Sequence, residues 1–207
     1  SEGFIGNGSE PWKLPSMSEF PEIHPPIIDK CEGKFKPFEI DPETLVRKWA
    51  LPGTPGLEHR VGGLEKDENG AVSSDPIVHD RMVNARAEKI ARVANCIPPL
   101  EVVGKQEGDV LIVGWGGTYG HLYTATKELL DEGASVGFAH FDYINPLPKN
   151  TVEVFSKFKK IIVCELNSGQ FVNYLRAKAP QFKYEQVTKV QGQPFIVKEI
   201  IEAVKAL

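Results

Sequence analysis

Beyond residue 100, short apolar runs alternate with longer stretches in which apolar residues recur every three or four positions. The apolar runs predict strands at residues 110–113, 136–139, 161–164 and 184–190. The periodic stretches predict helices at residues 119–131, near 151–157, at 169–178 and at 195–206. Strands that alternate with helices form a doubly wound, mostly parallel sheet with right-handed crossovers. Because the strands are apolar throughout, we expect an α/β fold in which both faces of the sheet are covered.

The first 70 residues follow a different pattern, with little helical or alternating periodicity. They hold nine of the 16 prolines and nine of the 19 glycines, which keep a backbone extended or turning. Large apolar residues stand between these chain breakers, and a disordered linker rarely carries so many. They are Trp12, Phe20, Ile23, Ile27, Ile28, Phe35 and Phe38. We therefore expect an extended arm, up to about residue 40, whose apolar side chains dock on another surface.

Three further elements are predicted between residues 41 and 100. Asp41 followed by Pro42 predicts the start of a short helix. Residues 49–63 contain two Pro-Gly turns and a Gly-Gly pair, and they predict a shaped loop. Asp75 before Pro76 predicts a second helix, which Pro98-Pro99 ends. Its apolar positions have helical spacing and charges occupy its other face, which indicates a solvated amphipathic helix.

Composition narrows the classes of function. The chain has 207 residues, of which 41% are hydrophobic and 25% charged, and its net charge is −4. These values are ordinary for a globular protein of one domain with a long appendage, or of two small domains. A mildly acidic chain with no Lys/Arg cluster argues against binding to nucleic acid or to a membrane surface. No apolar run approaches the roughly 20 residues that a membrane-spanning helix needs.

Cysteine usage and the first residues add two expectations. Cys31, Cys96 and Cys164 lie far apart in the sequence and have no ligand spacing for zinc or an iron–sulfur cluster. Cys164 lies in a predicted strand and indicates a buried thiol, and this usage fits a reducing cytoplasm. The chain starts at Ser1 rather than Met, with no signal-peptide pattern, which suggests a piece of a longer protein.

A glycine-rich turn follows the first predicted strand of the sheet. Gly114, Gly116, Gly117 and Gly120 stand in the order G-x-G-G-x-x-G before a helix, where backbone amides can hold a phosphate. Asp142 follows about 25 residues later, where a ribose-binding acid would sit. The alternative is tight packing of the helix on the strand, and we favour it because the register of the last glycine and the bulk of the residue at 115 do not suit a dinucleotide.

Polar residues also follow the third predicted strand. Glu165, Asn167 and Gln170 lie where a strand ends and a helix begins, and they are candidates for a polar rim at the carboxyl edge of the sheet. The alternative is helix capping by Asn167 or Ser168. The two interpretations are equal for Asn167, and the rim is favoured for Glu165.

The shaped loop carries the remaining candidates. His59 lies beside Glu58 and could act as a general base or contact a substrate. From the residues alone, a structural histidine that is hydrogen-bonded inside a turn is favoured. Arg47 and Thr54 could hold a carboxylate, the arginine through a bidentate pair. His140 and the other histidines have no partners at ligand spacing, and no role is assigned to them.

Several strings, taken in order, resemble one family. They are residues 9–12 (SEPW), 49–65 (WALPGTPGLEHRVGGLE), 114–120 (GWGGTYG), 145–148 (NPLP) and 165–170 (ELNSGQ). Together they resemble the C-terminal part of the alpha subunit of 2-oxoglutarate:ferredoxin (2-oxoacid:acceptor) oxidoreductase. The resemblance spans nearly the whole chain, and the string at 49–65 is the most specific. That string leans towards 2-oxoglutarate among the 2-oxoacids.

The resemblance implies a division of the chain into three parts. Residues 1–20 would be the tail of a missing pyrimidine-binding domain, residues 21–100 a connector, and residues 101–207 an α/β domain similar to the transketolase C-terminal domain. Its implied partners are that pyrimidine-binding domain, the beta subunit and, through the complex, ferredoxin. The parent complex uses thiamine diphosphate, magnesium, an iron–sulfur cluster and coenzyme A. By analogy Arg47, Thr54, Glu58 and His59 are substrate-side candidates.

Departures from the family pattern limit what the chain is expected to do alone. The thiamine-activating glutamate, the diphosphate-binding motif and the cluster cysteines are missing from the sequence. We therefore expect no cofactor bound by this chain alone and no catalysis, but a role in assembly and in walling the active site. Under the resemblance, the glycine-rich turn carries no nucleotide. Two alternatives stay open: a stand-alone nucleotide-binding module, indicated by that turn with Asp142, and a non-catalytic interaction domain, indicated by the apolar arm.

Overall fold

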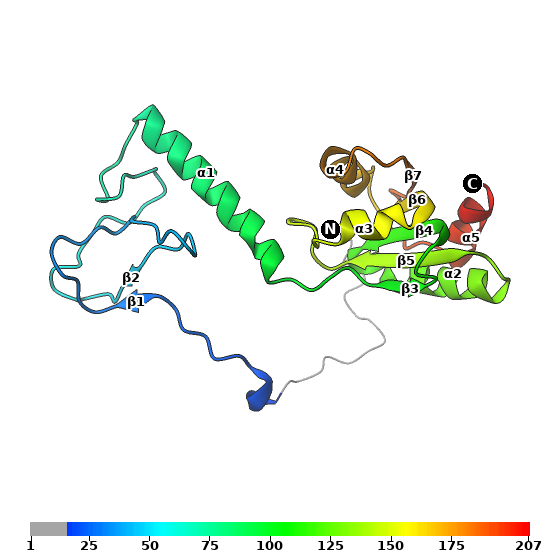
Figure 1. The fold of residues 1–207 in the computed structure, drawn as a ribbon, viewed down its shortest axis with the longest axis horizontal. Coiled ribbons are helices and arrows are strands. Elements are labelled where there is room, and N and C mark those ends of the chain that lie inside the picture. Colours follow the sequence, from blue (N-terminus) through cyan, green and yellow to red (C-terminus); the bar gives the residue numbers. More distant parts are fainter. Residues whose placement is uncertain (1–15) are drawn as a thin grey trace. The chain divides into compact units, whose positions relative to one another are not determined.

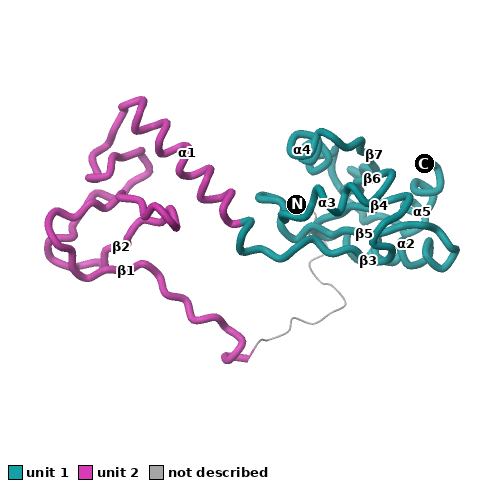
Figure 2. The backbone as a smooth tube through the Cα atoms, in the orientation of Figure 1, with its two compact units in different colours: residues 1–11, 94–207 teal, residues 12–93 magenta. Residues whose placement is uncertain are grey.

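The computed structural model describes residues 16–207, so the string at 9–12 and the first part of the expected arm lie outside the described residues. The described chain forms two compact units, which Figure 2 colours separately. One unit ends at Val93 and the other runs from Ala94 to Leu207. The division therefore falls several residues before the position near 101 at which the sequence pattern changes. Each unit is described by itself below.

The unit from Ala94 to Leu207 is built on one five-stranded sheet (Figure 1). Its strands are β3 (Val102–Gly104), β4 (Gly108–Trp115), β5 (Val136–Phe141), β6 (Phe158–Glu165) and β7 (Tyr184–Thr188), in the spatial order β3-β5-β4-β6-β7. All neighbours are parallel except β3, which runs antiparallel to β5. The predicted mostly parallel sheet is confirmed.

Helices cover both faces of this sheet, as a doubly wound fold requires (Figure 1). They are α2 (Tyr119–Asp131), α3 (Thr151–Ser156), α4 (Gln170–Lys178) and α5 (Val197–Lys205). Side chains of a strand alternate between faces. Leu111 of β4 therefore packs in one buried cluster with Phe155 of α3 and Leu175 of α4. Its neighbour Ile112 packs in the opposite cluster, which includes residues of α2 and α5.

Each predicted element of this unit is present, with most ends displaced by one to three residues. The helix predicted at 119–131 has those bounds, because its apolar period is strong and Gly133, in the left-handed region (φ 86°), ends it. The strand predicted to Val190 ends at Thr188, and the helix predicted from Phe195 begins at Val197. The short edge strand β3 has no counterpart in the prediction, because three residues carry too little alternation to be recognised.

Before residue 76, the unit that ends at Val93 contains little regular structure. It includes a 3-10 turn, η1 (Met17–Glu19), and two short parallel strands, β1 (Ile27–Ile28) and β2 (Trp49–Ala50). In the described part of the expected arm, the side chains of Phe20 and Ile23 are exposed. Docking of the arm on another surface therefore stays a prediction. No helix within residues 16–207 has the length and apolar character needed to cross a bilayer.

The short helix predicted at Asp41 does not form. One carboxylate oxygen of Asp41 accepts hydrogen bonds from the backbone amides of Glu43 and Thr44, at 3.0 and 2.7 Å, and so begins a turn. Leu45 then takes a left-handed conformation (φ 57°), and the amide of Asp41 donates to the carbonyl of Val46. The chain folds back after one turn, because these contacts satisfy the backbone that a helix would have used.

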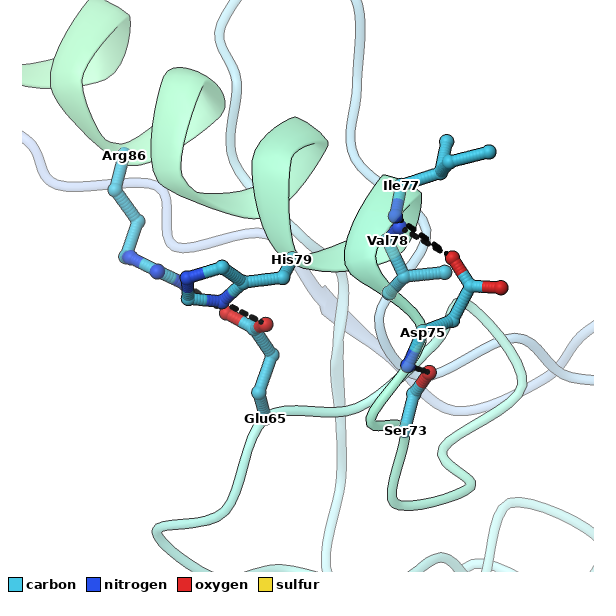
Figure 3. Close-up of polar contacts among 7 residues, drawn as sticks. All are labelled: Glu65, Ser73, Asp75, Ile77, Val78, His79 and Arg86. Carbon is cyan, nitrogen blue, oxygen red and sulfur yellow. Dashed lines mark hydrogen bonds and ion pairs between the residues drawn. The ribbon is translucent and has the colours of Figure 1, made fainter.

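The second predicted helix is α1 (Pro76–Arg92), followed by the 3-10 turn η2 (Val93–Asn95). Its predicted start is confirmed: Asp75 accepts from the amides of Ile77 and Val78 at 2.8 and 3.0 Å, and Pro76 occupies the first turn (Figure 3). The helix contains no buried residue, in agreement with the predicted solvated helix.

Candidate functional site

The shaped loop at residues 49–63 is held by its own backbone. Gly53 and Gly56 both have positive φ (86° and 82°), which a residue with a side chain rarely adopts. The amide of Thr54 donates to the carbonyl of Leu51, and that of Leu57 to the carbonyl of Thr54, each at 3.2 Å. Leu57, only 5% exposed, anchors the loop. The two Pro-Gly turns predicted here are therefore present as consecutive bends.

Glu58 and His59 both make contacts inside the loop. The Glu58 carboxylate accepts a hydrogen bond from the amide of Gly56 at 2.8 Å. Nδ1 of His59 lies 2.9 Å from the carbonyl oxygen of Leu57 and must carry a proton to bond it, so in the neutral ring Nε2 holds the lone pair. The His59 ring also packs edge-on to Phe35, with ring centroids 5.5 Å apart. A structural contact therefore orients the imidazole, and Nε2 is the nitrogen able to accept a proton.

All four substrate-side candidates line one cavity of about 430 Å³. The cavity lies within the unit that ends at Val93, and Arg47, Thr54, Glu58 and His59 contribute its main polar groups together with Lys48. Its apolar wall includes Ile27, Pro37, Trp49, Leu51, Leu57 and Val61. The loop and the strand pair β1–β2 thus bring together side chains that the sequence could relate only by their proximity along the chain.

Arg47 borders this cavity, and its guanidinium also contacts an aromatic ring. The guanidinium carbon lies 4.5 Å from the centroid of the Phe38 ring, a cation–π contact. Phe38 lines a second cavity, of about 330 Å³, which Arg47 also borders. The arginine therefore forms part of the wall between the two cavities.

The second cavity contains a lysine that the sequence analysis did not single out. Lys66 is only 1% exposed, and its ammonium donates to the carbonyl oxygens of Gly62 and Leu64 at 2.9 and 2.6 Å. In the sequence it stands in the charged run Glu65-Lys66-Asp67-Glu68, which has the character of a solvated turn. The signal available was the Gly62-Gly63 pair four residues earlier, because a lysine at that distance can reach back to the carbonyls of a turn.

Glu65, which also lines the second cavity, ties the loop to α1. Its carboxylate lies 2.7 Å from Nδ1 of His79 and 3.0 Å from a guanidinium nitrogen of Arg86 (Figure 3). These contacts, the His79 hydrogen bond first, lower the pKa of Glu65, so that it stays ionised. His79, to which no role was assigned from the sequence, therefore positions the start of α1.

The polar residues at the carboxyl end of β6 are more buried than a rim requires. Glu165 is fully buried, and its carboxylate accepts from the backbone amides of Phe171 and Val172 at 2.7 and 2.8 Å and from the indole of Trp115 at 3.3 Å. The prediction that favoured a rim role for Glu165 is corrected: its carboxylate caps the first turn of α4, where helix amides lack partners.

Asn167 and Gln170 have different settings. The Asn167 side-chain oxygen accepts from the amides of Gly169 and Gln170 at 2.8 and 2.9 Å, which is the capping interpretation. Gln170 is exposed and lines a small hollow of about 190 Å³ with Trp115 and Tyr174. Of the three predicted rim residues, Gln170 therefore remains accessible at this edge.

The glycine-rich turn is packed tightly against the helix that follows it. A Cβ atom on Gly114 would lie 2.2 Å from Cδ1 of Leu122 and 2.7 Å from Oγ1 of Thr118, closer than real contacts allow. Gly116 has positive φ (59°), and the buried Thr118 hydroxyl closes the turn on the backbone of Trp115. This geometry accounts for these glycines by packing of strand on helix, the favoured interpretation. Gly117 and Gly120 need no such explanation.

Asp142 lies at the carboxyl end of β5, next to a cavity of about 360 Å³ that Tyr119 and His140 also line. Its carboxylate is 3.8 Å from Nε2 of His140, and the Tyr119 ring meets that imidazole edge-on at 5.1 Å. Burial lowers the pKa of His140, and Asp142 partly offsets this effect. Nδ1 of His140 is buried without a hydrogen-bond partner among residues 16–207. None of the four turn glycines lines this cavity.

Comparison with known proteins extends these observations. Residues 108–200 match the family described as pyruvate:ferredoxin oxidoreductase core domain II. The chain is 40% identical over its whole length to the 2-oxoglutarate oxidoreductase subunit KorA of Mycobacterium tuberculosis, of which it covers 31%. It is 31% identical, over 92% of its length, to the alpha subunit of 2-oxoacid:ferredoxin oxidoreductase 2 of Aeropyrum pernix, of which it covers 30%.

The structure also has a close relative among solved structures. The 2-oxoglutarate:ferredoxin oxidoreductase from Magnetococcus marinus, solved with 2-oxoglutarate, coenzyme A and succinyl-CoA bound, matches with a TM-score of 0.83 and 31% identity. The match covers 93% of this chain and 34% of that one. The chain thus spans about a third of the length of the relatives it matches, and both cavities near the shaped loop precede the domain at 108–200.

Proposed function

We propose that the chain is the C-terminal part of an alpha subunit of a 2-oxoacid:ferredoxin oxidoreductase, because it is similar to such subunits over its whole length. In this proposal the parent complex oxidatively decarboxylates a 2-oxoacid to its coenzyme A thioester and passes the electrons to ferredoxin. This chain contributes to assembly and to the walls of the active site, and it carries out no chemistry alone. The ligands named for the Magnetococcus marinus enzyme support 2-oxoglutarate as the substrate.

One observation carries the part of the proposal that concerns this chain. Arg47, Thr54, Glu58 and His59 come together around a single cavity of about 430 Å³, with Lys48 beside them. Arginine, lysine and a hydroxyl are the groups that hold a carboxylate in proteins. His59 presents a nitrogen able to accept or donate a proton, because its other nitrogen is held by the Leu57 carbonyl. We therefore assign binding of a substrate carboxylate to Arg47 and Thr54.

Glu58 has a different role in this proposal. Its carboxylate is engaged by the Gly56 amide, so it shapes the loop in which His59 stands. Glu58 is thus a positioning residue, while Arg47 and Lys48 supply positive charge and Thr54 a hydroxyl group to the cavity.

The cofactors of the parent complex are assigned to its other parts. Within residues 16–207 no three His, Cys, Asp or Glu side chains are grouped so as to fit a metal ion, and Cys31, Cys96 and Cys164 lie apart. In the proposal the pyrimidine-binding domain of the same subunit and the beta subunit supply these groups, and the complex works in the cytoplasm with ferredoxin and coenzyme A.

The test uses the full alpha subunit that contains this chain, assembled with its beta subunit. Initial rates of 2-oxoglutarate-dependent reduction of a viologen dye are measured over a range of substrate concentrations. We expect Arg47→Ala to lower kcat/KM about tenfold, mainly through KM, because it removes a charge-assisted contact to the substrate. His59→Ala is expected to lower kcat more than KM, since it removes the proton-accepting group.

Lys127→Ala, at an exposed position of α2, is the matched control and should leave both constants unchanged. Circular dichroism and the elution volume of the assembled complex verify that each variant folds and binds its beta subunit. Wild-type kinetics for both Arg47→Ala and His59→Ala would remove the assignment of the cavity to the substrate. A complex that turns over pyruvate but not 2-oxoglutarate would change the substrate class and leave the rest in place.

A further inference from the structure

The second cavity, beside α1, has an unbalanced charge. It is an open hollow of about 330 Å³ that lies entirely within the unit that ends at Val93. Four of its lining residues are cations, namely Arg47, Lys66, Arg86 and Lys89, and Glu65 is the single acid among them. The positive side chains around this cavity therefore outnumber the negative ones by three, although the whole chain has a net charge of −4.

The single acid is already engaged. Glu65 binds Arg86 at 3.0 Å and His79 at 2.7 Å, as Figure 3 shows. Among residues 16–207, no carboxylate pairs with Arg47, Lys66 or Lys89, the three other cations of the cavity. The negative charge that would balance these groups does not come from the described part of the chain.

Two of the unbalanced cations share one aromatic ring. The guanidinium carbon of Arg47 lies 4.5 Å, and the ammonium of Lys66 5.3 Å, from the centroid of Phe38. Lys66 is only 1% exposed, so solvent screens its charge less than that of an exposed side chain. An anion beside the ring would be attracted by both cations.

The ammonium of Lys66 can take one more oxygen acceptor. An ammonium carries three N–H groups, and two of them reach the carbonyl oxygens of Gly62 and Leu64. Its other contact among residues 16–207 is the face of the Phe38 ring, 5.3 Å away. An anionic oxygen is a stronger acceptor than an aromatic ring, so an anion in the cavity would bind the third N–H more strongly.

We propose that this cavity binds a small dianion. Phosphate and a short dicarboxylate share the chemistry that the site recognises: up to two negative charges, pairs of acceptor oxygens that a guanidinium can bind, and a size that fits 330 Å³. The apolar part of the lining, from Ile40, Leu45, Met82 and Ala85, suits the carbon chain of a dicarboxylate. The proposal stands apart from the substrate assignment, because the two cavities share only Arg47.

The test is calorimetric titration of the 207-residue chain at low ionic strength with phosphate, with glutarate and with acetate. We expect saturable binding of one phosphate or one glutarate per chain, and at least tenfold weaker binding of acetate, since a single charge meets fewer of the cations. Binding of glutarate but not phosphate identifies a dicarboxylate site, and the reverse identifies a phosphate site.

Variants of opposite sign make the test sharp. Lys89→Gln, which removes a cation without an acid partner, should weaken binding about fivefold. Glu65→Gln removes the only lining acid and should strengthen binding by a similar factor. Lys127→Gln, the same change of charge at an exposed position of α2, should have no effect. Lys66→Met is expected to abolish binding, but its buried ammonium also holds the Gly62–Leu64 turn, and Glu65 also ties the loop to α1, so Lys89 with its control Lys127 carries the conclusion.

Two results would overturn the proposal. One is the absence of saturable binding for both dianions. The other is an equal loss of affinity in Lys89→Gln and Lys127→Gln, which would reduce the effect to net charge. Neither result depends on turnover of a 2-oxoacid, so failure here and failure of the substrate assignment remain distinguishable.

Discussion

Replacing Glu165 by glutamine should destabilise the α/β unit strongly while leaving its surface unchanged. The buried carboxylate accepts three hydrogen bonds, from the amides of Phe171 and Val172 at 2.7 and 2.8 Å and from the Trp115 indole at 3.3 Å. A glutamine has the same shape, but one of its two oxygens becomes an NH₂ group. The NH₂ group would face at least one of these N–H groups. The hydrogen bond to that N–H group is then lost, and two donors point at each other.

The magnitude follows from the number and kind of these bonds. A hydrogen bond to a charged group contributes about 2 kcal/mol, and a buried donor left without an acceptor costs about 1 kcal/mol more. The expected loss in free energy of unfolding is about 3 kcal/mol. With a typical urea dependence of about 1.5 kcal/mol per M, the unfolding midpoint should fall by about 2 M.

The assay is urea unfolding at pH 7, followed by far-ultraviolet circular dichroism and by tryptophan fluorescence, to which Trp115 contributes from within the affected contact. Glu185→Gln, at an exposed position of β7, is the control and should move the midpoint by less than about 0.3 M. A Glu165→Gln midpoint within about 0.5 M of the unchanged chain would refute the capping role. Glu165 would then have to act through a ligand at the sheet edge.

Three further predictions concern the same unit. Gly114→Ala should lower the free energy of unfolding by about 2 kcal/mol, because its Cβ would lie 2.2 Å from the buried Leu122. Gly120→Ala places its Cβ in open space and should be neutral or stabilising. Thermal unfolding of both variants checks this prediction. Burial lowers the pKa of His140, so the folded state favours the neutral ring, and stability should fall as the pH drops below the ordinary value of 6.5. His140→Gln should flatten that part of the stability–pH profile, and an unchanged profile would contradict the assignment. Burial also raises the pKa of the Cys164 thiol. A thiol reagent should therefore modify the exposed Cys31 and Cys96 rapidly, and Cys164 only when the chain unfolds. Rapid modification of all three cysteines would be inconsistent with the fold.

The α/β unit could be predicted from the sequence because its signals are local. The helix at Tyr119–Asp131 shows a regular apolar period and a glycine after its end, and both its bounds agree with the structure. The strands around Ile112 and Ile162 are apolar on both faces, which only a sheet covered by helices on both sides explains. The edge strand β3 was not predicted, because it is short and precedes the alternating strands and helices of this unit. It pairs with β5 in the antiparallel direction.

The irregular unit resisted the same reasoning because its contacts are not periodic. Asp41-Pro42 has the residues of a helix start, yet the chain turns back when Leu45 takes a left-handed conformation. Local preference was overridden by the backbone pairing of Asp41 with Val46. The resemblance of residues 49–65 to one family predicted where the candidate side chains lie, but not which of them share a cavity.

The amino-acid sequence alone determined the layered α/β architecture, the start of α1 and the similarity to 2-oxoacid:ferredoxin oxidoreductase alpha subunits, because these depend on periodicity, capping residues and ordered strings that can be read along the chain. Only the tertiary structure decided which charges are buried. Glu165 caps a helix that begins five residues later, and Lys66 turns back to the carbonyls of an earlier turn. The role of a buried charge depends on the partners that folding brings close to it. The distances to those partners cannot be read from the order of residues in the sequence.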